Sequence, residues 1–249
     1  MEFRGHAPLL AAPDPRRFDV AASLRDPFGQ LMIRVYGQRS AIAVRALADV
    51  SASMGFEGHG RKMDLLADFT ESLAWSAHRS GDLFAFTGCD SEIRRDLEQP
   101  ATRTRTAGAA IAARLRKLEP AGQGAQGLLE AAAQIPAARA LIFLVSDFHF
   151  PLALLRTLLA KLAPHAVVPV VLWDGAEGRA PRFGIARVMD PETGARRTLL
   201  LRPSLAERLQ QAMARRARRL VDCCSAFGLE PLFLEDRFDA DAVTRYFYG

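Results

Sequence analysis

The stretch VRALADVSASM, residues 44–54, decides the predicted fold. Its first half is an apolar run typical of a buried strand, and the run ends abruptly in Asp49-x-Ser51-x-Ser53. In an open α/β sheet, ligands bind just beyond the carboxyl ends of the strands. A carboxylate and two hydroxyls at alternate positions are a compact set of oxygen donors, which suits a Mg²⁺-like ion. The same residues could instead only shape a turn and cap the next helix, so this spacing alone leaves both interpretations open.

A second strand strengthens the metal interpretation. Residues 140–146, ALIFLVS, are the strongest buried-strand signal in the chain, and they too are followed by an acid, Asp147. Two buried parallel strands that end in acids can bring those acids to one edge of a sheet. The sequence therefore predicts a site formed by both strand ends.

Strand and helix patterns alternate through the rest of the chain, which predicts an α/β fold. We expect a doubly wound, mostly parallel sheet with helices on both faces and an inserted β-hairpin near 184–201. Residues 1–40 are expected to form an N-terminal arm and strand packed on the core, and residues 41–249 one domain. The expected strands are 31–36, 41–49, 83–87, 91–97, 140–146, 166–173 and 232–234; the expected helices are 61–79, 107–118, 125–134, 152–162, 204–227 and 239–247.

Together these features resemble a known family. Asp49-x-Ser51-x-Ser53, the helix after it, and a later strand ending in Ser146-Asp147 look like a von Willebrand factor type A domain with its metal-ion-dependent adhesion site. More narrowly, the chain resembles the bacterial proteins of unknown function that accompany MoxR-type AAA+ ATPases, and, within them, accessory proteins of methanol oxidation. The stretches that carry this resemblance are residues 13–19, 51–54, 80–82, 146–148 and 190–194.

The resemblance implies a set of metal ligands. Ser51 and Ser53 would ligate the ion directly, and Asp49 and Asp147 would act directly or through water. The family pattern also has a threonine in an intervening loop, which here reads GQGAQG over residues 122–127 and contains no threonine. Gln126 or a water could fill that position, which predicts weakened rather than abolished binding of Mg²⁺, Mn²⁺ or Ca²⁺.

The loop at 122–127 also spells G-x-G-x-x-G, and Asp147 follows Gly127 by 20 residues, which superficially matches a dinucleotide-binding fingerprint. That motif must follow a buried strand, whereas residues 114–120 are charged, helix-like and closed by a proline. A nucleotide-dependent enzyme that uses Gly122–Gly127 is therefore the weaker alternative, and a flexible connection between helices is favoured.

Composition limits the remaining possibilities. The chain has 249 residues, 49% hydrophobic and 24% charged, and a formal charge of +5 that comes mainly from arginine. No aromatic-interleaved basic stripe supports nucleic-acid binding. The three cysteines have no C-x-x-C spacing, which fits a reducing compartment. No apolar run reaches the roughly 18 residues of a membrane span, and a signal-peptide pattern is missing, so we expect a cytoplasmic protein.

A basic run, Arg215, Arg216, Arg218 and Arg219, lies in the predicted long helix near the C-terminus. Such a run is usually a solvated helix face, but it could also bind an acidic partner surface.

These observations favour a non-enzymatic protein. The resemblance implies an adaptor or co-chaperone of a MoxR-type AAA+ ATPase in the maturation of a client, for which methanol dehydrogenase is one candidate. It also implies contact through an acidic side chain that the partner supplies to the metal. A scaffold with a degenerate metal site is a further alternative, since the threonine is missing.

Overall fold

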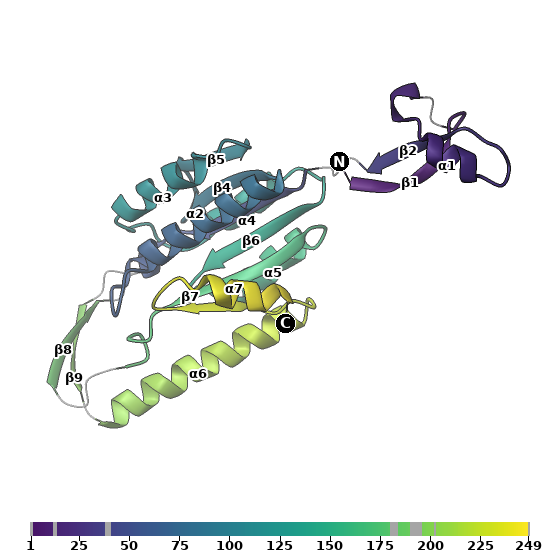
Figure 1. Cartoon of the computed structure of the whole chain (residues 1–249). Coiled ribbons are helices and arrows are strands. Elements are labelled where there is room, and N and C mark those ends of the chain that lie inside the picture. The colour runs from purple at the N-terminus through teal and green to yellow at the C-terminus, as the bar shows by residue number, and fades with distance from the viewer. Residues whose placement is uncertain are drawn as a thin grey trace. The chain divides into compact units, whose positions relative to one another are not determined.

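The computed structural model describes residues 2–11, 14–37, 41–179, 184–189, 196–201 and 203–248. The chain divides into two compact units, Met1–Ala41 and Ile42–Gly249. Figure 1 follows the chain through the helices and strands of both units.

The first unit is a small antiparallel sheet with a short helix. Strand β1 (Glu2–Pro8) pairs with β2 (Met32–Gly37), and helix α1 (Val20–Arg25) follows a 3₁₀ turn at Pro15–Arg17. Asp19 ties these parts together, because it accepts hydrogen bonds from Ala22 N of α1 and from Arg34 Nε of β2, at 3.0 and 2.6 Å. The sequence predicted β2 but not β1. The packing of residues 1–40 on the larger domain stays a prediction.

The second unit is built on a six-stranded sheet in the order β10-β7-β6-β3-β4-β5. Every neighbouring pair is parallel except β4 and β5, which pair antiparallel at the edge. Strand β5 runs on to Thr102, beyond the predicted end at 97, and contains Pro100, which an edge strand tolerates. The strands are β3 (Ala43–Asp49), β4 (Leu83–Cys89), β5 (Ile93–Thr102), β6 (Ala140–Ser146), β7 (Ala166–Trp173) and β10 (Leu232–Glu235).

Helices cover both faces of this sheet, because successive apolar side chains of its strands point to opposite faces and both sets are buried. In β6, Phe143 and Val145 belong to one apolar core, and Ile142 and Leu144 belong to the other. The first core is completed by α2 (Lys62–Ser80), α3 (Ala107–Lys117) and α7 (Ala240–Tyr248), the second by α4 (Gly127–Ala133), α5 (Leu152–Leu162) and α6 (Pro203–Ser225). The predicted fold class, a doubly wound and mostly parallel α/β sheet, is confirmed.

The predicted inserted hairpin is also present. Strand β8 (Gly184–Met189) pairs antiparallel with β9 (Arg196–Leu201). The predicted turn at 190–194 lies outside the described residues. Among the helices that the structure describes, none is long and apolar enough to cross a membrane.

All five parallel strands of the sheet lead into an aspartate at the carboxyl end. Asp49 is the last residue of β3, and the other four follow directly after β4, β6, β7 and β10 as Asp90, Asp147, Asp174 and Asp236. This edge of the sheet, where ligands of open α/β folds bind, is therefore strongly acidic.

Candidate metal centre

The structure brings the four predicted ligands together. Strands β3 and β6 are adjacent, parallel and in register, so Asp49 and Asp147 reach the same edge. After β3 the chain turns through a short 3₁₀ helix at Ala52–Gly55, which places the Ser51 and Ser53 hydroxyl oxygens 3.3 Å apart. Ser53 Oγ donates a hydrogen bond to Asp147 Oδ1 at 3.2 Å. All four side chains are buried.

Asp49 is held by groups on both strands. Ser146 Oγ donates to its Oδ2 at 2.7 Å, and the Ser51 backbone N donates to its Oδ1 at 2.9 Å. Burial, and then the charge of Asp147, raise the pKa of Asp49 to about 7 against these hydrogen bonds. Asp49 is thus a carboxyl group whose charge has little compensation.

Asp147 has a different environment, because a buried lysine contacts it. Lys62 Nζ donates to Asp147 Oδ2 at 2.8 Å and to the Ser53 carbonyl oxygen at 3.3 Å, and it also pairs with the carboxylate of Glu177. Burial alone would raise the pKa of Asp147. The charges of Lys62 and His149 outweigh the effect of burial, so the pKa of Asp147 is lowered. Burial would likewise lower the pKa of Lys62, but Asp147 and Glu177 raise it, so Lys62 stays protonated.

The donor set fits a small divalent cation. Two carboxylates and two hydroxyls converge, all are hard oxygen donors, and the uncompensated Asp49 favours an added positive charge. Lys62 pairs with Asp147 and Glu177, whereas no cationic side chain among the described residues pairs with Asp49. Asp49 is therefore the carboxyl group at which an added cation would compensate the cost of burial.

The 122–127 loop lies beside this site but does not have the context of a nucleotide-binding loop. The Ala52 backbone N donates to the Gly122 carbonyl oxygen at 2.7 Å, which joins the loop to the Asp-x-Ser-x-Ser turn. The element before the loop is helix α3 rather than a strand, which removes the basis for the nucleotide alternative. Gln126 is exposed, with its Oε1 close over Gly124, and its role as a substitute ligand stays a prediction.

Asp90 lies against the same loop and was missed by the sequence analysis. It is buried, accepts a hydrogen bond from the Glu92 backbone N at 3.1 Å, and pairs with Arg94 at 3.4 Å. A Cβ atom at position 122 would come within 2.2 Å of Asp90 Oδ2, so Gly122 is required for this close approach.

The basic run of α6 is not uniform. Arg215, Arg218 and Arg219 are exposed, as a partner-binding face would need. Arg216 is instead half-buried, and its Nη2 donates to the carbonyl oxygens of Phe148 and Phe150, the latter at 2.5 Å. The structure thus gives Arg216 an internal role, fixing the chain just after Asp147. Partner binding by the four arginines stays a prediction.

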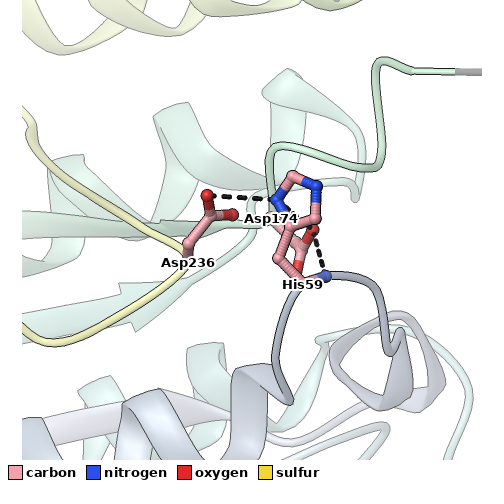
Figure 2. Close-up of side chains that lie close together, drawn as sticks. All are labelled: His59, Asp174 and Asp236. Carbon is pink, nitrogen blue, oxygen red and sulfur yellow. Dashed lines mark hydrogen bonds and ion pairs between the residues drawn. The ribbon is translucent and has the colours of Figure 1, made fainter.

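A second group, His59, Asp174 and Asp236, lies further along the same edge (Figure 2). One ligand atom from each of the three residues lies within 4.8 Å of the others, which is close enough to hold a metal ion. The hydrogen bonds explain the cluster in another way. Asp174 accepts from the backbone N of His59, Gly60 and Ala176 at 2.8 to 3.0 Å, so it holds the 57–61 loop to the end of β7.

The other two residues complete this arrangement. Figure 2 shows His59 next to both acids, and its Nδ1 lies 3.2 Å from Asp236 Oδ2 and 3.8 Å from Asp174 Oδ1. Asp236 Oδ1 accepts from the Gly175 backbone N at 2.6 Å. We therefore assign this cluster to loop anchoring.

One of the other acids could have been found from the sequence, because the rule that selected Asp147, an acid directly after a predicted buried strand, also selects Asp174 after residues 166–173. Asp90 and Asp236 escape this rule, since β4 and β10 run to Cys89 and Glu235, beyond the predicted strand ends at 87 and 234. No local signal marks Lys62 or Glu177, because each looks like an ordinary surface residue until the fold buries it.

Comparison with known proteins identifies the family. A family model described as "Protein of unknown function DUF58" matches residues 13–219. The chain belongs to the DUF58 family. It is also 40% identical over 99 residues to an "Uncharacterized protein in moxR 3'region" of Paracoccus denitrificans, a match that covers 39% of this chain and 94% of that protein. The predicted resemblance to the family of unknown function that accompanies MoxR-type ATPases is thereby confirmed.

Two solved structures have a similar course of the chain but share little sequence with this protein. The conserved hypothetical protein BatB from Bacteroides thetaiotaomicron is 14% identical with a TM-score of 0.45, and the SpRpn10 VWA domain is 11% identical with a TM-score of 0.43. Each match covers 83% of this chain and 95% of the other. With identities and TM-scores this low, these two structures indicate nothing about the function of this chain.

Proposed function

We propose that this DUF58 protein is a non-enzymatic protein-interaction module that binds partners through a divalent metal ion. The observation that carries the proposal is the convergence of Asp49, Ser51, Ser53 and Asp147 at the carboxyl edge of the sheet. These four residues would hold Mg²⁺, or Mn²⁺ or Ca²⁺, and the ion would accept an acidic side chain from the partner. The role of this chain is then to present and orient the ion.

The proposed partner is a MoxR-type AAA+ ATPase. Support comes from the relative in the moxR 3' region of Paracoccus denitrificans. This chain would act as an adaptor or co-chaperone while the ATPase matures a client, and the narrower sequence resemblance suggests a metalloenzyme such as methanol dehydrogenase. Three buried free thiols, Cys89, Cys223 and Cys224, support the cytoplasm as the proposed location.

Capture of the ATPase tests this proposal. The MoxR-type ATPase of the same organism is passed over the immobilised full chain in Mg²⁺ and in chelator. We expect saturable binding in Mg²⁺ that weakens at least about tenfold in chelator and in Ser51→Ala/Ser53→Ala, because the ion loses two ligands. Ser76→Ala, an exposed serine of α2, is the matched control and should bind like the wild type.

The two parts of the proposal can fail separately. Equal capture with and without Mg²⁺ would keep the ATPase partner but exclude the metal from the contact. An absence of capture under all conditions would exclude the ATPase as partner.

A further inference from the structure

Lys62 is an unusual residue for its position. It is the first residue of α2 and is only 2% exposed. A cation at a helix N-terminus meets the positive end of the helix dipole, and a buried ammonium loses its hydration. Both effects oppose a lysine here, so its contacts must compensate for them.

The compensating contacts lie inside the proposed metal centre. Lys62 Nζ lies 2.8 Å from Asp147 Oδ2 and also pairs with Glu177. Glu177 is nearly buried, and its other oxygen lies 2.9 Å from His149 Nε2. Glu177 belongs to the turn after β7, where its backbone N donates to the Asp174 carbonyl oxygen at 3.0 Å. The ammonium therefore bridges a proposed metal ligand and a carboxylate that is not one.

We propose that Lys62 is an internal cation that competes with the divalent ion for Asp147, and that Glu177 holds the Lys62 ammonium when Asp147 is engaged. This inference rests on the proposed metal site and adds the residues that set its affinity. Lys62 weakens metal binding, because its charge is close to that of the ion and because it uses one oxygen of Asp147. Glu177 favours metal binding, because it gives the ammonium a second place to pair.

Opposite effects are therefore expected from the two residues. Lys62→Met should bind Mg²⁺ at least about tenfold more tightly than the wild type, since the competing charge is removed. Lys62→Arg keeps the charge and should show no such gain. Glu177→Gln should bind Mg²⁺ about tenfold more weakly, because the lysine then pairs with Asp147 alone.

A double-mutant cycle separates this exchange from a general effect of charge. If Glu177 acts through Lys62, Glu177→Gln should change the affinity of Lys62→Met less than about threefold. If Glu177 acts only through its negative charge, Glu177→Gln would weaken Mg²⁺ binding equally in the wild type and in Lys62→Met. Glu57→Gln is the matched control, because Glu57 is exposed and pairs with Arg61 instead.

The measurement is isothermal titration of the chelator-stripped full chain with MgCl₂, with circular dichroism to verify folding. Two results together support the proposal. Lys62→Met binds Mg²⁺ more tightly than the wild type, and Glu177→Gln weakens Mg²⁺ binding in the protein with Lys62 but not in Lys62→Met. Unchanged affinity in Lys62→Met, or equal Glu177 effects in both backgrounds, overturns it while the metal site itself stands. An absence of Mg²⁺ binding in the wild type and in all variants overturns the metal site as well. If Lys62→Met does not fold, an unchanged affinity in Glu177→Gln overturns the inference.

Discussion

Two aspartates at one sheet edge have opposite electrostatic environments. Lys62 contacts Asp147 at 2.8 Å and lowers its pKa, whereas Asp49 has only hydroxyl and amide donors and its pKa rises to about 7. The difference arises mainly from Lys62 on α2, with a smaller contribution from His149. In the absence of metal, Asp49 is the group of the pair that takes up a proton.

This difference predicts how stability depends on pH. A carboxyl group whose pKa is higher in the folded state stabilises the fold fully below its unfolded pKa of 3.8, and this contribution is lost as pH rises toward 7. Asp49→Asn removes the charge without changing the shape. In chelator at pH 8 we expect Asp49→Asn to be more stable than the wild type by an amount on the order of 2 kcal/mol. The difference should vanish near pH 4.

Urea unfolding at several pH values measures this difference. Asp96→Asn, an exposed acid of β5, is the control and should show no comparable gain at pH 8. An Asp49→Asn curve parallel to that of the wild type across this range would show that Asp49 is not a strained carboxylate.

At the scale of elements, Asp174 joins the loop before α2 to the end of β7. Burial would raise the pKa of Asp174, but the backbone donors His59, Ala176 and Gly60 outweigh it and lower it. The loop must also approach closely, because a Cβ atom at Gly58 would lie 2.4 Å from Asp174 Oδ1. The loop leads directly into Lys62, so this contact helps to position Lys62 beside Asp147.

Removal of that carboxylate should therefore be costly. We expect Asp174→Ala to destabilise the fold by about 3 kcal/mol at pH 7, because three backbone N–H groups lose a charged acceptor. The loss should shrink as pH falls below 3.8, since a lowered pKa gives stability that is present above the unfolded value and disappears in acid. Urea unfolding measures both effects.

Asp236→Ala is the comparison for this change. Asp236 is partly exposed and accepts one backbone hydrogen bond, from Gly175, so we expect a loss of only about 1 kcal/mol. Equal losses in the two variants would contradict the assignment of Asp174 as the main anchor of the loop.

The sequence predicted elements well where one periodic signal dominated. Helix α2 was expected at 61–79 and lies at Lys62–Ser80, because apolar residues at helical spacing and the closing Gly81 agree. Strand β1 was missed, because proline, arginine and glycine conceal its pattern and its partner β2 is far away in sequence. Strand β5 was predicted too short, because Pro100 reads as a loop signal although an edge strand accepts it.

At the scale of the whole molecule, the limits of sequence reasoning are contacts between distant segments. The ends of β3 and β6 could be placed together because parallel strands share a carboxyl edge. The contact of Lys62 with Glu177 could not be predicted from the sequence, because it depends on how the start of α2 faces the turn after β7. The internal role of Arg216 could not be predicted either. In the sequence Arg216 looks the same as its exposed neighbours, and its role becomes visible only when α6 is placed against the chain after β6.

The convergence of the four oxygen donors is the basis of the proposed function, and divalent metal binding is its central claim. The most direct test is the thermal stability of the chelator-stripped chain as Mg²⁺ is added, for the wild type and for Asp49→Ala. An ion at about 100 times its dissociation constant should add roughly 2.7 kcal/mol to the free energy of unfolding. We predict a saturable rise in the wild type that is lost in Asp49→Ala. The same response in both proteins, or none in either, would contradict a metal site at Asp49.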